Sequence, residues 1–113
     1  MATVIHRRDL PGGASSREFQ GHLAGDSSLS FIWIESNPGD GPRLHRHPYE
    51  EIFVVIEGSA TFYLGDEKVQ VTTGDIVIGP ANVPHRFVNN GPGALRQIDI
   101  HASDHFVTEW LEH

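Results

Sequence analysis

Short segments in which apolar and polar residues alternate run along most of the chain. Residues 28–36 (SLSFIWIES) alternate so that Phe31 and Trp33 share one face, and residues 94–103 (ALRQIDIHAS) show the same period. A period of two residues is the pattern of a β-strand with one buried face. Residues 50–58 (EEIFVVIEG) are almost continuously apolar, which is typical of a strand buried on both faces.

Turn residues separate these segments at short intervals. Residues 59–75 predict a hairpin with its turn at Gly65 and Asp66. Residues 75–80 and 83–93 each predict a further short strand that ends in glycine and proline, and weaker strand signals lie at residues 3–8 and 17–23. About eight to ten short strands with frequent turns predict an all-β sandwich or small barrel.

The last segment departs from this pattern. Ser103 has the chemistry of a helix N-cap, and Phe106 and Trp110 would then share one helical face. The sequence therefore predicts an all-β fold with a short C-terminal helix, on which Trp110 packs against the barrel or a partner subunit.

Length and charge narrow the function classes. A chain of 113 residues predicts one domain, residues 1–113, and a net charge of −7 without a basic run argues against nucleic acid and anionic membranes as partners. No stretch approaches the ~20 apolar residues of a membrane span. The first residues lack the apolar centre of a secretory signal, so a cytoplasmic location is expected.

The spacing of four polar residues is the strongest chemical signal. His45 and His47 are two residues apart, so on an extended strand they point to the same side. A proline after His47 bends the chain, and Glu51 then lies at the start of the next apolar segment. Glu50 is one residue out of phase with Glu51 and should face away. His85 comes from far along the chain, on a strand whose inward face it should share.

A protein without cysteine can hold a metal only through nitrogen and oxygen ligands. Imidazoles and a carboxylate suit Fe, Mn, Co, Ni, Cu or Zn, and three histidines with one glutamate leave coordination positions open for catalysis. The alternative is that these histidines are unrelated side chains, each satisfied by the backbone.

The spacing resembles the two conserved motifs of the cupin superfamily. Residues 39–58 read G-x5-H-x-H-x3-E-x6-G, and residues 74–89 read G-x5-P-x-N-x2-H-x3-N. Asn82 stands where the family usually has glycine. Asparagine is the residue that best replaces glycine at a positive φ, so a tight turn is expected there.

This resemblance implies a small single-domain cupin, with the family's double-stranded β-helix, a jelly-roll-like barrel. It also implies the metal ligands, which are His45, His47, Glu51 and His85. The ligand set resembles those of flavonol dioxygenases and of oxalate-processing cupins.

The resemblance favours a metal-dependent enzyme acting on a small organic substrate, in particular a dioxygenase-like oxidoreductase in which Glu51 is ligand and catalytic base. A non-redox Lewis-acid enzyme (isomerase, decarboxylase, lyase or cyclase) and a non-catalytic module that binds a small molecule or a metal remain as alternatives. A homodimer is expected, because small cupins commonly pair.

Three charged or titratable residues near the motifs have two interpretations each. Arg43 and Arg86 would meet an anionic substrate or, as we favour, form surface ion pairs. His101 would be an acid or base beside the metal or, as we favour, a strand-end histidine with a hydrogen bond of its own.

Overall fold

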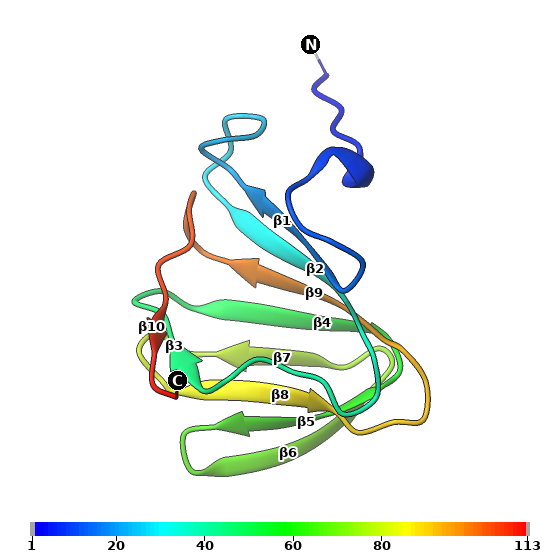
Figure 1. Ribbon diagram of the computed structural model, residues 1–113. Coiled ribbons are helices and arrows are strands. Elements are labelled where there is room, and N and C mark those ends of the chain that lie inside the picture. The colour runs from blue at the N-terminus through cyan, green and yellow to red at the C-terminus, as the bar shows by residue number, and fades with distance from the viewer. Residues whose placement is uncertain (1, 113) are drawn as a thin grey trace.

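Two five-stranded antiparallel sheets make up the computed structural model, which describes residues 2–112 (Figure 1). One sheet has the order β1-β2-β9-β4-β7 and the other β10-β3-β8-β5-β6. The elements are η1 (Arg7–Asp9, a 3-10 helix), β1 (Ser16–Gln20), β2 (Ser30–Ser36), β3 (His45–Arg46), β4 (Glu51–Glu57), β5 (Ser59–Leu64), β6 (Glu67–Thr72), β7 (Ile76–Gly79), β8 (His85–Asn89), β9 (Leu95–His101) and β10 (Glu109–Trp110).

The all-β prediction is confirmed. The predicted hairpin is β5 and β6, which pair from Ser59–Thr72 to Leu64–Glu67 around a turn in which Gly65 has a φ of 56°. The signal at residues 17–23 corresponds to β1. The signal at residues 3–8 was wrong, since that stretch has no strand and ends within η1.

The predicted C-terminal helix is also wrong. Ser103 does not cap a helix; its hydroxyl accepts the His105 N–H at 3.3 Å, a local bond that competes with helix formation. Further on, β10 pairs with β3, so that Trp110 lies opposite His45. Residues 103–112 therefore run as an extended strap past the histidine-bearing segment, and tertiary pairing overrides the helical period.

Aromatic and aliphatic side chains fill one end of the space between the sheets. Phe53, Phe62 and Phe87 pack edge-on or tilted with ring centroids 4.9–6.2 Å apart, and each is almost completely buried. The remaining members of this core are Val55, Ala60, Val71, Val77 and Leu95. Because this end is closed by packing, the opposite end is left for polar side chains.

Strand β9 has its polar side chains inside. Gln97, Asp99 and His101 are at most 3% exposed, while Ile98 and Ile100 between them are partly exposed on the outer face. The alternation predicted for residues 94–103 is confirmed, but its apolar face is the outer one.

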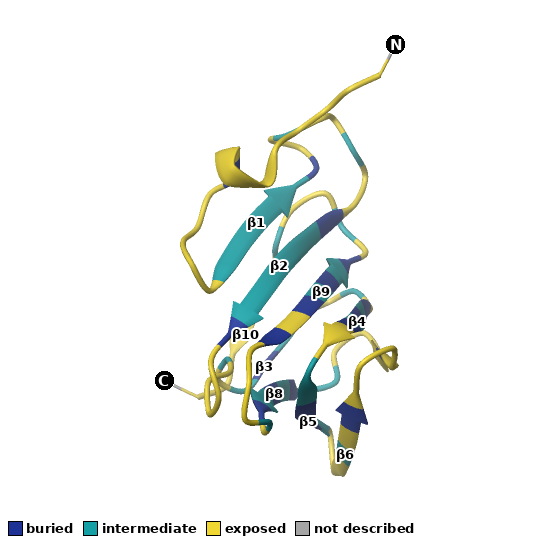
Figure 2. Ribbon diagram, turned by 90° about the vertical axis from the view of Figure 1, so that its right-hand side faces the viewer, coloured by how far each residue is buried: buried dark blue, intermediate teal, exposed yellow. Residues whose placement is uncertain are grey.

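Strand β4 is buried on its inner face only, which corrects the two-sided burial expected for residues 50–58. On the outside, Ile56, Ile76 and Ile78 are 52%, 64% and 59% exposed. Figure 2 shows the mixture of exposed and buried positions along the strands, with β1 intermediate throughout. Within residues 2–112, no helix has the length and apolarity needed to cross a membrane.

Candidate metal centre

The four residues singled out by their spacing meet at the polar end of the barrel. His45 lies on β3, His47 directly follows it, Glu51 opens β4 and His85 opens β8. One ligand atom from each lies within 4.8 Å of the others, and all four residues are buried. Glu50 is exposed, as its phase predicted.

A backbone turn joins the two motifs in space. Asn82 has a φ of 66°, so the prediction of a left-handed turn there is confirmed. Its N–H donates to the carbonyl of His47 at 2.7 Å. The turn before β8 is thus fastened to the segment that carries the first two histidines, which holds His85 opposite His45 in the sheet.

Backbone carbonyls orient the three clustered imidazoles in the same way. Each ring has its Nδ1 within hydrogen-bond distance of a carbonyl oxygen, and because a carbonyl only accepts, Nδ1 carries the hydrogen. The acceptors are Arg43 for His45 (2.6 Å), Val107 for His47 (2.8 Å) and Val83 for His85 (3.1 Å). In the neutral rings, Nε2 is therefore left with a lone pair, as a metal ligand requires.

The contacts of Glu51 show that these donors fit a cation. Its Oε1 lies 3.1 Å from Nε2 of His47 and 3.1 Å from Nε2 of His85. A carboxylate oxygen and neutral Nε2 atoms are all acceptors, so this approach is favourable only with a cation or an added proton between them. A divalent metal satisfies all of these atoms at once.

Burial and neighbouring rings set the charges of the centre. Burial lowers the pKa of His45 to about 4, so this ring is neutral near pH 7. For Glu51, burial opposes ionisation, but hydrogen bonding, most of all from His101, outweighs it and holds the pKa below its usual range. The centre thus offers a metal one neutral ligand, His45, and one ionised ligand, Glu51.

His101 also contacts Glu51, from the other side. Its Nε2 lies 3.0 Å from Oε2, and its Nδ1 lies 2.6 Å from the hydroxyl of Tyr49. The Tyr49 oxygen accepts the Val107 N–H at 3.2 Å, so its own hydrogen goes to Nδ1 of His101. His101 then carries its hydrogen on Nε2, opposite to the clustered rings, and the strand-end interpretation of this residue was incomplete.

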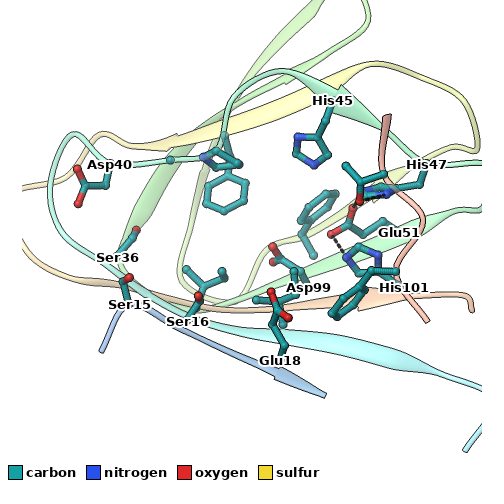
Figure 3. Close-up of a pocket in the computed structure, with 18 of the residues that line it drawn as sticks. Ser15, Ser16, Glu18, Ser36, Asp40, His45, His47, Glu51, Asp99 and His101 are labelled. Carbon is teal, nitrogen blue, oxygen red and sulfur yellow. Dashed lines mark hydrogen bonds and ion pairs between the residues drawn. The ribbon is translucent and has the colours of Figure 1, made fainter. Parts of the chain in front are cut away.

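A cavity of about 400 Å³ opens onto the cluster. His45, His47 and Glu51 line it on one side, and Figure 3 shows Ser15, Ser16, Glu18, Ser36 and Asp40 on the other side. Apolar parts of the wall come from Ile32, Ile34, Phe53, Phe87, Phe106 and Trp110. A small molecule in this space would touch both the cluster and the polar wall.

Asp99 lies between the cluster and that wall (Figure 3). Burial raises its pKa well above the usual value, and the charge of Glu51 adds to this effect. Gln97 donates to its Oδ1 at 2.7 Å, so the acid proton belongs on Oδ2. Asp99 is therefore more easily protonated than an exposed aspartate, and it lies beside the cluster.

The two flanking arginines do not enter the cavity. The guanidinium of Arg86 lies over the ring of Tyr63, 4.6 Å from its centroid, and Arg43 lines a neighbouring hollow together with Glu112. Among the described residues neither of them forms an ion pair, so the structure shows neither a place in the cavity nor the surface ion pairs that we favoured for them.

Sequence reasoning missed Asp99 and Tyr49. The signal for Asp99 was present, because it is in phase with His101 on a strand whose other face is isoleucine. Tyr49 had no such signal, since its contact with His101 spans 52 residues of sequence.

The comparisons with known proteins agree with this fold and site. The model of the cupin domain matches residues 32–101. Auxin-binding protein 1 of Arabidopsis thaliana is 47% identical over 108 residues, which cover 81% of this chain and 54% of that protein. Acireductone dioxygenase of Drosophila pseudoobscura pseudoobscura is 34% identical over 76 residues, which cover 61% of this chain and 38% of that protein. The chain thus spans about half, or less, of these two relatives.

Solved structures show the same architecture. Oxalate decarboxylase of Bacillus subtilis superposes with a TM-score of 0.84 at 22% identity, over 98% of this chain and 33% of that one. The SPY1581 protein of Streptococcus pyogenes superposes with a TM-score of 0.64 at 20% identity, over 76% of this chain and 70% of that one. At these identities the likeness shows the fold alone. Since the family match spans more than half of the residues, the chain belongs to the cupin family.

Proposed function

We propose that this chain is a metal-dependent enzyme acting on a small organic molecule, and that a dioxygenase-like oxidoreductase is the favoured activity. The observation that carries the proposal is that the cavity opens directly onto His45, His47 and Glu51. A site that only stabilised the barrel would have no need of a cavity beside its ligands.

His45, His47, Glu51 and His85 would hold one divalent transition metal, such as Fe, Mn, Ni, Co, Cu or Zn. That metal would supply Lewis acidity toward a substrate oxygen and, where it is redox-active, a partner for O2.

The cavity has two carboxyl groups, Glu51 and Asp99, whose pKa values are shifted in opposite directions. The pKa of Glu51 lies below its usual range, whereas burial raises the pKa of Asp99, so Asp99 is the more easily protonated of the two. Two carboxyl groups whose pKa values differ in this way would favour a reaction that moves a proton on the substrate, with Asp99 as the group that holds it.

The relatives support two versions of this function. The likeness to acireductone dioxygenase supports oxygen chemistry on an enolic substrate. The likeness to auxin-binding protein 1 supports a second candidate, a module that binds a small molecule without converting it. A non-redox Lewis-acid enzyme would use the same ligands and the same cavity.

The first test is elemental analysis of the purified chain beside His85→Ala, with His6→Ala as the matched control. His6 is exposed and outside the cluster. About one equivalent of metal in the wild type and His6→Ala, with loss in His85→Ala, is expected. A wild type that neither contains nor takes up metal would overturn the proposal.

Oxygen uptake then separates the candidate reactions. The metal-loaded chain is given a panel of enolic and phenolic compounds in an oxygen electrode. Consumption that depends on His85 is the expected result. Conversion of a compound without oxygen uptake would show a non-redox enzyme, and binding without conversion would show a binding module.

A further inference from the structure

The cavity has an acidic and hydroxyl-bearing wall opposite the metal cluster. Glu18 on β1 and Asp40 in the loop after β2 both line it, together with Ser15, Ser16 and Ser36 (Figure 3). Among residues 2–112, no lysine or arginine lines the cavity. The end of a ligand that lies away from the cluster therefore meets carboxylates and hydroxyls.

Six of the eight basic side chains make contacts outside the cavity, and of the other two Arg8 is exposed and Arg43 lines the neighbouring hollow. Arg7 and Arg96 both contact Glu35, Arg46 pairs with Glu109, Arg17 donates to the carbonyl of Leu10, and Arg86 and Lys68 lie over the ring of Tyr63. These contacts hold six of the positive charges on the outside. A change of side-chain rotamer that brought one of them into the cavity would first break such a contact.

One hydroxyl on this wall is buried without a partner. Ser36 is 7% exposed, and its Oγ has no hydrogen-bond partner although it borders the cavity. A buried polar atom of this kind costs free energy until something bonds to it. A polar group of a bound ligand would supply that bond.

We infer that the ligand of this cavity carries hydroxyl or ammonium groups, and no negative charge, at the end that lies away from the cluster. The inference rests on the proposed function, in which the other end of the ligand meets the metal. A carboxylate at the far end would face Glu18 and Asp40 with no cation to offset them, whereas a hydrogen-bond donor would be accepted by them and by Ser36.

Three catechols that differ only in their tails test this selectivity. They are 2-(3,4-dihydroxyphenyl)ethylamine, 2-(3,4-dihydroxyphenyl)ethanol and 3,4-dihydroxyphenylacetate, which share a metal-chelating head and end in ammonium, hydroxyl and carboxylate. Their affinities for the zinc-loaded chain are measured by calorimetry without oxygen, since zinc does not oxidise the head. We expect the ammonium and hydroxyl probes to bind roughly tenfold or more tightly than the carboxylate probe.

Variants that each remove one negative charge show which carboxylates cause the difference in affinity between the probes. Glu18→Gln and Asp40→Asn are expected to bring the affinities of the ammonium and carboxylate probes closer together. Asp66→Asn removes the same charge from the exposed β5–β6 turn and is expected to leave the ratio unchanged.

The outcomes also separate this inference from the proposed function. Equal affinities, or tightest binding of the carboxylate probe, would overturn the inference while leaving the metal site in place. Binding of no probe to the zinc-loaded chain, or the same binding to His85→Ala, would overturn the proposed function and this inference with it.

Discussion

Nε2 of His101 lies 3.0 Å from Oε2 of Glu51, on the side of the carboxylate opposite the clustered imidazoles. Tyr49 holds the far nitrogen of the same ring at 2.6 Å and is itself fixed by the N–H of Val107. The orientation of Glu51 thus depends on a chain of contacts that reaches the C-terminal strap. His101 and Tyr49 are positioning residues for the metal centre.

Removal of either positioning residue should weaken metal binding without abolishing it. Outer partners of metal ligands typically contribute about 10–100-fold in affinity. We expect Tyr49→Phe to lose about tenfold and His101→Asn somewhat more, because the second change also frees Oε2 of Glu51. The dissociation constant for Zn²⁺ is measured by competition with a chelator.

Tyr63→Phe is the matched control for Tyr49→Phe, because its ring lies outside the cavity beneath Arg86. Zinc affinity should be unchanged in this variant. Equal affinities of Tyr49→Phe and the wild type would show that the contact between Tyr49 and His101 does not act on the centre.

The φ of 66° at Asn82 gives a prediction about stability. Glycine adopts this conformation without strain, so Asn82→Gly should stay within about 1 kcal/mol of the wild type. A β-branched residue is poorly tolerated there, and Asn82→Val should cost about 1–3 kcal/mol. Urea unfolding of the metal-free variants measures both free energies, and equal stability of the two variants would contradict the assignment of strain.

Asp99 predicts a dependence of stability on pH. Because burial raises its pKa in the folded chain, the folded state keeps a proton that the unfolded state loses. The stabilisation is full below the usual pKa of an aspartate and is lost as the pH rises toward the folded value. Asparagine resembles the protonated acid, so Asp99→Asn should gain stability relative to the wild type as the pH rises above about 4, by at most about 1.4 kcal/mol per pH unit.

Urea unfolding of the metal-free proteins at several pH values measures this difference, because contributions of the histidines are common to both chains. Asp66→Asn on the exposed β5–β6 turn is the control and should show no such trend. A constant difference between Asp99→Asn and the wild type would mean that Asp99 is ionised in the folded chain.

The centre could be predicted from the sequence because its residues are placed by local rules. The period of a strand puts His45 and His47 on one side, the break at Pro48 brings Glu51 back at the start of β4, and a turn at Asn82 precedes His85. Each of these features depends on a few neighbouring residues, and the resemblance to the cupin motifs supplied their arrangement in space.

The C-terminal strap and the cavity wall could not be predicted in the same way. Residues 103–112 have a helical period, but pairing of Trp110 with His45 decides their conformation, and that contact is far apart in sequence. Glu18 and Asp40 reach the cavity only because β1 and β2 fold over it. Non-local contacts of this kind leave no pattern in a short window of sequence.

The homodimer expected from the sequence stays a prediction, and the outer face of β4 and β7 indicates where to test it. Ile56, Ile76 and Ile78 are each more than half exposed there, and Ile78 lies beside Ile52 in the register. Burial of such side chains contributes about 1.5–3 kcal/mol each. Light scattering at micromolar concentration should therefore give about twice the chain mass of 12.5 kDa.

Negative charges introduced on the outer face of β4 and β7 should prevent formation of the homodimer. Ile76→Glu combined with Ile78→Glu is expected to give a monomer that keeps its fold, because both side chains already contact solvent. Lys68→Glu on the exposed strand β6 is the control for an added negative charge and should leave the dimer intact. A wild type that scatters as a monomer would rule out pairing, and a dimer that survives the double change would place the interface on another face.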